Sequence, residues 1–378
     1  MKLKSILSVS FMLAHFMAYT QISINVTSVP NDTPKNANIF AAGSFNNWSP
    51  NDPNFQLKVN HKGQYTLTIP ESNNKKEEYK FTLGNWENVE GDQNGDAISN
   101  RVLSDFNKKS IEVTIESWQK NKEKKSTASK NVQILNEKFK IPQLNTDRRI
   151  WIYLPEDYQT SNKKYPVIYM HDGQNLFDDL TAYAGEWKID ETLDSIFKTD
   201  KKSYIVVGID HGSDERLNEY GPWNNPKYGG GKGDLYADFL AKTLKPYIDK
   251  NYRTLTSAKN TGLMGSSMGG LISLYAGTKY PTKFGKLGIY SPSTWFTKKD
   301  LFQYVNSISK RNQKTKFYFY GGHLEGDSLV EDINEISEIL QSKGVPATNI
   351  KINTEQKGTH QEKYWAKEFP KTVKWLFP

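Results

Sequence analysis

Hydrophobic and polar positions alternate in two different ways along this chain of 378 residues. From Gln21 to about Trp118, short segments of alternating apolar and polar residues are separated by Asn, Asp, Gly and Pro. A period of two with frequent turn residues predicts a small antiparallel, immunoglobulin-like β-sandwich. From Val132 onward, apolar runs alternate with amphipathic segments of helical period. This order predicts an α/β domain with a mostly parallel sheet and helices on both of its faces.

The change of pattern sets the predicted domain boundaries. Residues 119–133 carry almost no apolar side chains, so we expect a solvated linker there. The sandwich is therefore placed at residues 21–118 and the α/β domain at residues 134–378. Helices are expected from about Lys188, from about Asp234 and over residues 328–342. Strands of the α/β domain are expected at residues 149–154, 166–170, 204–209, 262–264, 286–290, 316–320 and 349–353.

Residues 1–20 have the pattern of a secretion signal. Lys2 and Lys4 precede an apolar run from Ile6 to Ala18, and cleavage is expected before Gln21. A membrane anchor is the alternative, but this run is shorter than the ~20 residues that a membrane span requires. The chain contains no cysteine, which excludes disulfides and thiolate metal sites and fits a bacterial envelope or medium. We therefore expect a secreted or periplasmic protein with no membrane attachment after cleavage.

The charge of the chain adds little to this picture. The formal net charge of +8 becomes +6 if Lys2 and Lys4 leave with the signal. An excess of this kind can favour acidic polymers. However, many of the lysines fall in the predicted linker, and no basic face with interleaved aromatic residues is present elsewhere. Nucleic acid is therefore not an expected partner.

Residues 265–269, Gly-Ser-Ser-Met-Gly, fit the G-x-S-x-G nucleophile elbow. In such a turn a strand ends and a helix begins so sharply that the central residue is strained, and a neighbouring Cβ would clash. The apolar residues 261–264 before the motif and the helical pattern of residues 271–277 after it supply that context. Ser267 is therefore the candidate nucleophile, and the backbone N–H of Met268 is a candidate oxyanion donor.

A serine nucleophile needs a base and usually an acid that orients the base. In this kind of fold the acid follows the serine along the chain, and the histidine follows the acid. His360 comes after the last expected strand and is the candidate base. Glu325 and Asp327 both follow the preceding strand, so spacing does not decide which of them is the acid. Asp327 is also a candidate cap for the next helix.

A second oxyanion donor is expected in the loop after an early strand. Residues 171–175, His-Asp-Gly-Gln-Asn, form a glycine-containing loop of this kind, and the N–H of Gln174 is the candidate. His171 precedes the nucleophile, so we expect it to have a structural or pocket-wall role rather than a catalytic one. A mechanism of this type requires no metal and no organic cofactor.

Five segments together resemble the "putative esterase" branch of the α/β-hydrolases, which includes enterochelin, feruloyl and acetylxylan esterases and mycolyltransferases. The resemblance extends from about Asn136 to the C-terminus. It favours Glu325 as the acid and implies that the loops carrying Trp223 and Trp295 wall the substrate pocket, although either tryptophan could serve packing instead. The five segments are residues 171–177 (HDGQNLF), 216–223 (RLNEYGPW), 265–269 (GSSMG), 291–293 (SPS) and 358–360 (GTH).

The first domain resembles the starch- and glycogen-binding sandwich modules. The shared features are the turn at residues 43–48, Gly-Ser-Phe-Asn-Asn-Trp, and a later Tyr-Lys-Phe strand that ends near a second tryptophan. By position, the resemblance implies that Trp48 and Trp86 stack on sugar rings while Lys80 donates to sugar hydroxyls. The tryptophans could equally belong to the core of the sandwich. Polysaccharide binding by this domain is therefore one of two hypotheses.

Together with these two resemblances, which imply the acetyl or feruloyl esters of carbohydrates as substrates, the pattern predicts an exported serine carboxylesterase. Three other hypotheses remain open at this point. A siderophore esterase of the enterochelin type and an acyltransferase would use the same catalytic residues. A non-catalytic glycan-binding protein is the third, and the intact set of Ser267, His360 and a carboxylate argues against it.

Overall fold

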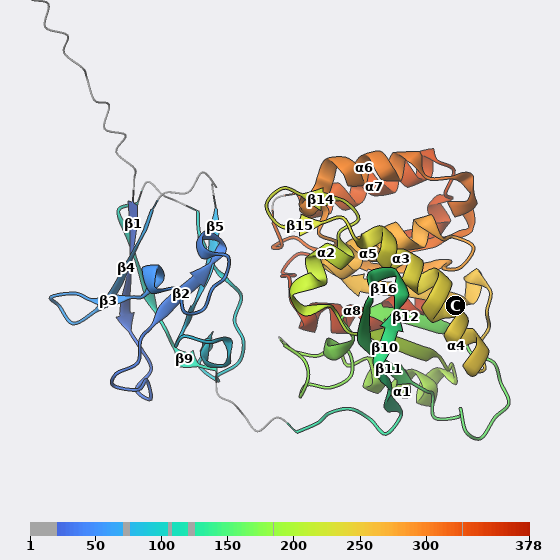
Figure 1. Ribbon diagram of the computed structural model, residues 1–378, viewed down its shortest axis with the longest axis horizontal. Helices are drawn as coiled ribbons and strands as arrows, with labels where there is room; N and C mark the ends of the chain where they lie inside the picture. Colours follow the sequence, from blue (N-terminus) through green and yellow to red (C-terminus); the bar gives the residue numbers. More distant parts are fainter. Residues whose placement is uncertain (1–20, 71–75, 105–107, 120–124, 184, 327) are drawn as a thin grey trace, which may run out of the picture. The chain divides into compact units, whose positions relative to one another are not determined.

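The computed structural model describes residues 21–70, 76–104, 108–119, 125–183, 185–326 and 328–378. The chain divides into two compact units, Met1–Glu123 and Lys124–Pro378 (Figure 1). The predicted signal at residues 1–20 and the alternative acid Asp327 lie outside the described residues. No helix in the described part of the chain combines the length and the apolar character needed to cross a membrane.

The first unit contains two main sheets whose inner faces share one core. Ile22, Ile24 and Val26 alternate along β1 and are buried together with Tyr79 and Phe81 from the other sheet. One pair departs from the antiparallel prediction, because β1 and β8 run parallel. The first sheet has the order β3 (Lys58–Val59), β4 (Tyr65–Pro70), β1 (Gln21–Ser28), β8 (Ser110–Thr114); the second has β2 (Phe40–Gly43), β5 (Glu77–Thr82), β7 (Arg101–Leu103); β6 (Glu90–Gly91) pairs with β9 (Ser117–Trp118).

The second unit is built on one mixed sheet of eight strands. Strands β13, β12 and β16 to β19 run parallel to one another, whereas β11 pairs antiparallel with both β13 and the edge strand β10. Every expected strand is present, but β10 was not predicted, because it is an edge strand whose side chains are mostly charged or exposed. The order is β10 (Val132–Ile141), β11 (Thr146–Tyr153), β13 (Ile205–Ile209), β12 (Val167–His171), β16 (Thr261–Ser266), β17 (Lys286–Tyr290), β18 (Lys316–Gly322), β19 (Ile350–Glu355).

Helices cover both faces of this sheet, as predicted. One buried cluster joins the sheet to α3 through α7 and a second joins it to α1 and α8, which lie on the opposite side (Figure 1). The helix expected from Asp234 is interrupted by a π-turn at Leu240–Leu244, and Pro246, which lacks an N–H, follows it. The helices are α1 (Ile189–Asp200), α2 (Arg216–Tyr220), α3 (Gly233–Phe239), α4 (Lys245–Asn251), α5 (Met268–Lys279), α6 (Lys298–Ser307), α7 (Leu329–Ser342) and α8 (Glu362–Leu376).

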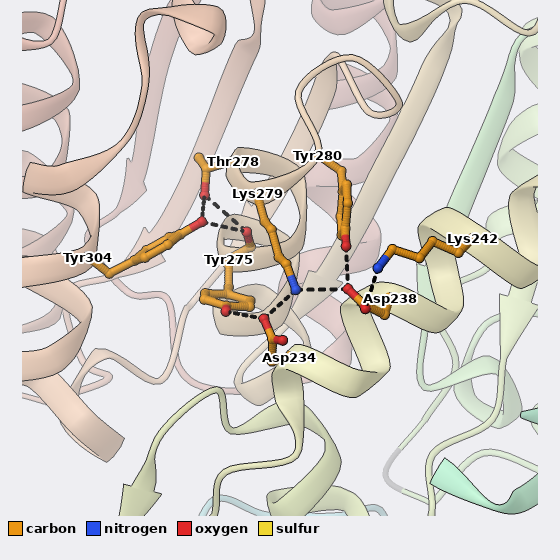
Figure 2. A network of polar contacts seen from close by, with 8 residues as sticks. All are labelled: Asp234, Asp238, Lys242, Tyr275, Thr278, Lys279, Tyr280 and Tyr304. Atoms are coloured by element: carbon orange, nitrogen blue, oxygen red, sulfur yellow. Dashed lines mark hydrogen bonds and ion pairs between the residues drawn. The ribbon is translucent and has the colours of Figure 1, made fainter. Parts of the chain in front are cut away.

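Helix α5 is buried almost all round and is held at its C-terminal end by a polar network (Figure 2). Lys279 Nζ lies 2.8 Å from Asp238 Oδ1 and also bonds Asp234, while the Tyr275 hydroxyl donates to Asp234 at 2.7 Å. Because Asp234 and Asp238 belong to α3, these contacts tie the two helices together.

The second half of the predicted linker is held to the second unit by hydrogen bonds. Residues 126–131 lie along the second unit, and their short polar side chains and backbone N–H groups bond carboxylates of that unit. Ser, Thr and Asn side chains can donate hydrogen bonds to carboxylates in a segment that has no apolar residues. A hydrophobicity pattern therefore does not detect such contacts. The contacts are Ser126 Oγ with Asp178 (2.7 Å), Thr127 Oγ1 with Glu186 (2.8 Å), Ser129 N with Asp190 (2.7 Å) and Asn131 Nδ2 with Asp194 (2.8 Å).

Candidate active site

Ser267 occupies a sharp turn between β16 and α5. Its φ of 58° and ψ of −125° lie in a region that non-glycine residues rarely adopt. A Cβ on Gly265 would lie 2.8 Å from the carbonyl oxygen of Gly269, so the turn leaves no room for a side chain there. The structure therefore has the strand, the strained serine and the helix in the order that a nucleophile elbow requires.

The segment that follows β17 holds Ser267 from the side. The Ser267 N–H donates to the Tyr290 carbonyl at 2.9 Å, and the Ser293 N–H donates to the Ser267 carbonyl at 3.1 Å. The two hydroxyls, Ser267 Oγ and Ser293 Oγ, are 3.2 Å apart. These contacts offset the strain of the turn and fix the position of the serine hydroxyl.

His360 and Glu325 form a close pair. His360 Nδ1 lies 2.7 Å from Glu325 Oε2; the Glu325 side chain is fully buried, whereas that of His360 is 45% exposed. A carboxylate only accepts hydrogen bonds, so Nδ1 carries the proton and Nε2 is the nitrogen left to accept one. The other oxygen, Glu325 Oε1, accepts from the Gly322 N–H at 2.7 Å and from the Ser291 hydroxyl at 2.8 Å.

A cavity of about 260 Å³ connects these groups. Glu325, His360, Ser293 and Trp295 are among its lining residues. Ser267 itself is not among the lining residues, but the hydroxyl of the lining residue Ser293 contacts the Ser267 hydroxyl. Trp295, which is 59% exposed, stands edge-to-face with Tyr228, a residue the sequence did not single out, at 5.6 Å. The cavity thus has an aromatic side and a polar side.

The two candidate oxyanion donors lie at the ends of neighbouring strands. Met268 is the first residue of α5, where an N–H has no acceptor within the helix. Gln174 lies in a single helical turn, Gly173–Asn175, that follows β12. Because β12 and β16 are paired and parallel, their carboxyl ends meet at the same edge of the sheet. The structure therefore brings both N–H groups to the edge that carries Ser267.

The structure places two other predicted pocket residues outside the lining of this cavity. His171 is 1% exposed, and its Nδ1 lies 3.1 Å from the Tyr236 hydroxyl. Its ring contacts the backbone side of the elbow, where a Cβ on Gly265 would lie 2.9 Å from it. Burial lowers the pKa of His171 to about 4, so the ring is neutral near pH 7 and supports the turn from behind. Trp223 packs instead against Tyr275 and Tyr304.

Two charged residues beside the elbow, Arg216 and Glu362, were not predicted as site residues from the sequence. Arg216 bonds both oxygens of Asp172, at 2.7 and 2.9 Å, and it lies in one of the segments that carried the family resemblance. Burial would raise the pKa of Asp172, but the charge and hydrogen bonds of Arg216 outweigh burial and lower it. Glu362 begins α8 two residues after His360, and burial raises its pKa to about 7. No pattern in the sequence marks Glu362.

We expect the substitution Glu362→Gln to stabilise the second unit at about pH 8 and to change it little at about pH 5. The carboxyl titrates near pH 4.5 when unfolded but about pH 7 when folded, so its stabilising contribution is complete below the lower value. That contribution is lost as the pH rises through the folded pKa. The loss corresponds to about 1 to 3 kcal/mol in the free energy of unfolding. Calorimetric melting at both pH values checks this, with Glu331→Gln, an exposed α7 residue, as control. The prediction would be wrong if Glu362→Gln changed the Tm by the same amount at both pH values.

Within the described residues, no group of three or more His, Cys, Asp or Glu side chains is arranged to hold a metal ion. The chemistry that the site offers on its own is therefore that of a serine hydroxyl, an imidazole and a carboxylate beside backbone N–H groups.

Comparisons with known proteins point to the same chemistry. The Esterase family model, described as "Putative esterase", matches residues 141–376. The uncharacterized protein YbbA of Bacillus subtilis is 27% identical over 245 residues, 61% of this chain and 93% of YbbA. The endo-1,4-beta-xylanase/feruloyl esterase of Xylanibacter ruminicola is 27% identical over 235 residues, 60% of this chain and 29% of that protein. The enterobactin esterase FES from Shigella flexneri shares the fold with a TM-score of 0.55 and 14% identity, over 90% of this chain and 88% of that one.

Proposed function

Because the chain belongs to the Esterase family, we propose that it is an exported serine carboxylesterase acting on acetyl or feruloyl esters of carbohydrates. One observation carries the catalytic part of this proposal. The His360–Glu325 pair lines the same cavity as Ser293, whose hydroxyl contacts the strained Ser267. The base and the acid thus line a cavity whose wall contacts the proposed nucleophile.

The mechanism assigns one role to each group. Ser267 Oγ attacks the ester carbonyl while His360 Nε2 takes its proton, and Glu325 keeps the imidazole in the required tautomer. The N–H groups of Met268 and Gln174 stabilise the negative oxygen of the tetrahedral intermediate. His360 then gives its proton to the departing alcohol, which leaves an acyl-enzyme. A water molecule repeats the attack, releases the acid and restores the Ser267 hydroxyl.

The substrate class rests on two observations. Trp295 and Tyr228 form an exposed aromatic wall beside the cavity, and a planar acyl group or the apolar face of a sugar packs well on such a wall. The name of the Xylanibacter relative joins a xylanase with a feruloyl esterase. Both favour an ester that is attached to a polysaccharide.

The alternative is a siderophore esterase, which the similarity to the enterobactin esterase over 90% of this chain favours. Hydrolysis of acetylated xylan, methyl ferulate, p-nitrophenyl acetate and ferric enterobactin, with the Ser267→Ala variant as blank, separates the hypotheses. We expect the highest kcat/KM on xylan acetate or methyl ferulate. Preference for ferric enterobactin would replace the proposal with the alternative. Products that carry the acyl group on an added sugar rather than on water would indicate an acyltransferase.

The first unit supplies a candidate glycan platform. The rings of Trp48 and Trp86 are both half-buried, with centroids 6.3 Å apart and planes inclined by 38°. Trp48 sits in a turn at a φ of 60°, which holds its ring beside that of Trp86. Lys80 Nζ donates to the Ile98 carbonyl at 2.5 Å. We propose that this pair of rings binds polysaccharide.

Replacing Trp48 and Trp86 together by alanine is expected to lower retention on insoluble starch or xylan at least about 10-fold, since each lost stacking contact is worth on the order of 1 kcal/mol. Turnover of p-nitrophenyl acetate should stay unchanged. The variant Val59→Ala removes an exposed apolar side chain from the same unit and serves as the control. Retention equal to that of the wild type, in a variant that still folds, would show that the two rings do not bind polysaccharide, and a lowered Tm would then assign them a packing role.

Export is proposed from the basic and apolar pattern of residues 1–20. Mass spectrometry of the protein recovered from the periplasm or medium checks it, and we expect a mature chain that begins at Gln21. Recovery of the intact chain from the cytoplasm alone would exclude export.

A further inference from the structure

Four side chains around the proposed base form a closed ring of contacts, which we call the acid–base ring. The Ser291 hydroxyl bonds Glu325, and Glu325 bonds His360. The His360 ring meets the Trp365 ring edge-to-face at 5.0 Å, and Trp365 Nε1 bonds the Ser291 hydroxyl at 2.9 Å. The members come from the ends of β17 and β18, the loop after β19 and helix α8.

The direction of the hydrogen bonds in this ring is fixed by chemistry. An indole N–H only donates, so the Ser291 oxygen accepts from Trp365. The hydroxyl must then give its own proton to Glu325 Oε1, 2.8 Å away. Glu325 Oε1 also accepts from the Gly322 N–H, and Oε2 accepts from His360. Every polar side-chain atom of Ser291 and Glu325 therefore has an assigned partner, and neither side chain can rotate without breaking at least two bonds.

The backbone at Ser291 shows that this arrangement is maintained against strain. Ser291 has a φ of 42°, and its N–H donates to the Tyr320 carbonyl at 2.7 Å. Glycine would adopt this conformation at a lower energetic cost than serine. Strained conformations persist where the surrounding contacts determine them, and they cluster at functional sites. Ser291 is buried, with 1% of its surface exposed. Its hydroxyl supplies the contacts with Glu325 and Trp365 that glycine could not make.

We propose that Ser291 is a positioning residue for ester hydrolysis: its hydroxyl fixes the carboxylate of Glu325 and, through it, the imidazole of His360, while Trp365 fixes the hydroxyl. This inference rests on the proposed Ser267–His360–Glu325 mechanism. Ser291 lines the cavity, but its hydroxyl is bonded to Glu325 and Trp365 and contacts neither Ser267 nor His360 directly. Its removal should therefore reduce the fraction of enzyme in which Nε2 is correctly aimed, which lowers kcat and leaves KM nearly unchanged.

The test uses the full chain with two substitutions at Ser291. Ser291→Ala removes the hydroxyl and keeps the Cβ, and Ser291→Gly removes the hydroxyl while relieving the strained backbone. We expect each to lower kcat on p-nitrophenyl acetate about 10- to 100-fold, the range of a lost hydrogen bond to a charged group. Ser337→Ala, which removes a buried hydroxyl on α7, is the matched control and should keep wild-type kcat.

A double-mutant cycle separates positioning from general support of the fold. If Ser291 acts through Glu325, then Ser291→Ala should cause less than about a 2-fold further loss in a Glu325→Ala background. A loss of the same factor in both backgrounds would overturn the proposal, as would wild-type kcat in Ser291→Gly. If Ser291→Ala does not fold, judged by its melting, Ser291→Gly decides the outcome. Wild-type kcat in Glu325→Ala itself would overturn both the proposed mechanism and this inference, whereas a defect there without one at Ser291 overturns only the inference.

Discussion

Replacing Ser267 by alanine is expected to lower kcat on p-nitrophenyl acetate by roughly 10⁵- to 10⁶-fold, as loss of the nucleophile does in other serine hydrolases. The substitution removes the only atom that forms the acyl-enzyme in the proposed mechanism. It should leave the fold intact, because alanine and serine are equally strained at a φ of 58° and the backbone bonds to Tyr290 and Ser293 remain. Binding of substrate should persist, since the N–H groups of the site are unaffected.

The neighbouring serine supplies a control for this prediction. Ser266 is the last residue of β16, is buried and lies in the same five-residue motif. Ser266→Ala should keep kcat within a few-fold of the wild type. The assignment of the nucleophile would be wrong if Ser266→Ala lost activity and Ser267→Ala kept it. Labelling by a fluorophosphonate, followed by peptide mass mapping, gives an independent identification of the reactive hydroxyl.

Replacing Glu325 by glutamine is expected to lower kcat about 10²- to 10⁴-fold with little change in KM. Three donors converge on this carboxylate, namely the Gly322 N–H, the Ser291 hydroxyl and His360 Nδ1. An amide of the same shape must direct its NH₂ group at one of these donors, because it has a single acceptor oxygen. The imidazole then turns or takes the other tautomer, and Nε2 no longer accepts the proton of Ser267.

Asp327→Asn is the matched substitution, because Asp327 was the other candidate acid in the sequence. We expect it to keep kcat within about 3-fold of the wild type, because Glu325 already occupies the place of the acid beside His360 Nδ1. A loss of 10²-fold or more in Asp327→Asn, with a mild effect in Glu325→Gln, would transfer the role of acid to Asp327. Single-turnover measurements distinguish slower acylation from slower deacylation in either case.

Particular residues show which parts of the fold and of the site could be predicted from the sequence. The elbow was predictable because its information is local: glycines on both sides of Ser267 and a strand and a helix that flank them. The pairing of His360 with Glu325 followed from chain order in the fold, although Asp327 could not be set aside by spacing. Edge strand β10 and the break near Pro246 were missed, because a charged edge hides the period of a strand and a π-turn preserves the period of a helix.

The remaining site residues depend on contacts between distant segments. The sequence left open whether His171 and Trp223 wall the pocket or serve packing, and the structure packs one behind the elbow and the other against Tyr275. The contacts of Ser291 with Glu325 and Trp365 join positions 34 and 74 residues apart along the chain. No periodicity or motif records such distances. They become visible only when the sheet brings the carboxyl ends of its strands to one edge.

The polar stretch at residues 126–131 changes where the chain should be cut to separate its two units. A fragment that begins at residue 134, as the hydrophobicity pattern suggested, would lack the donors that now reach four carboxylates at positions 178, 186, 190 and 194. Those acidic groups lie close together along one loop and helix, so their mutual repulsion would no longer be relieved by neutral hydroxyl and amide donors. A fragment that begins before Ser126 retains the esterase unit together with the segment 126–131 and its hydrogen bonds.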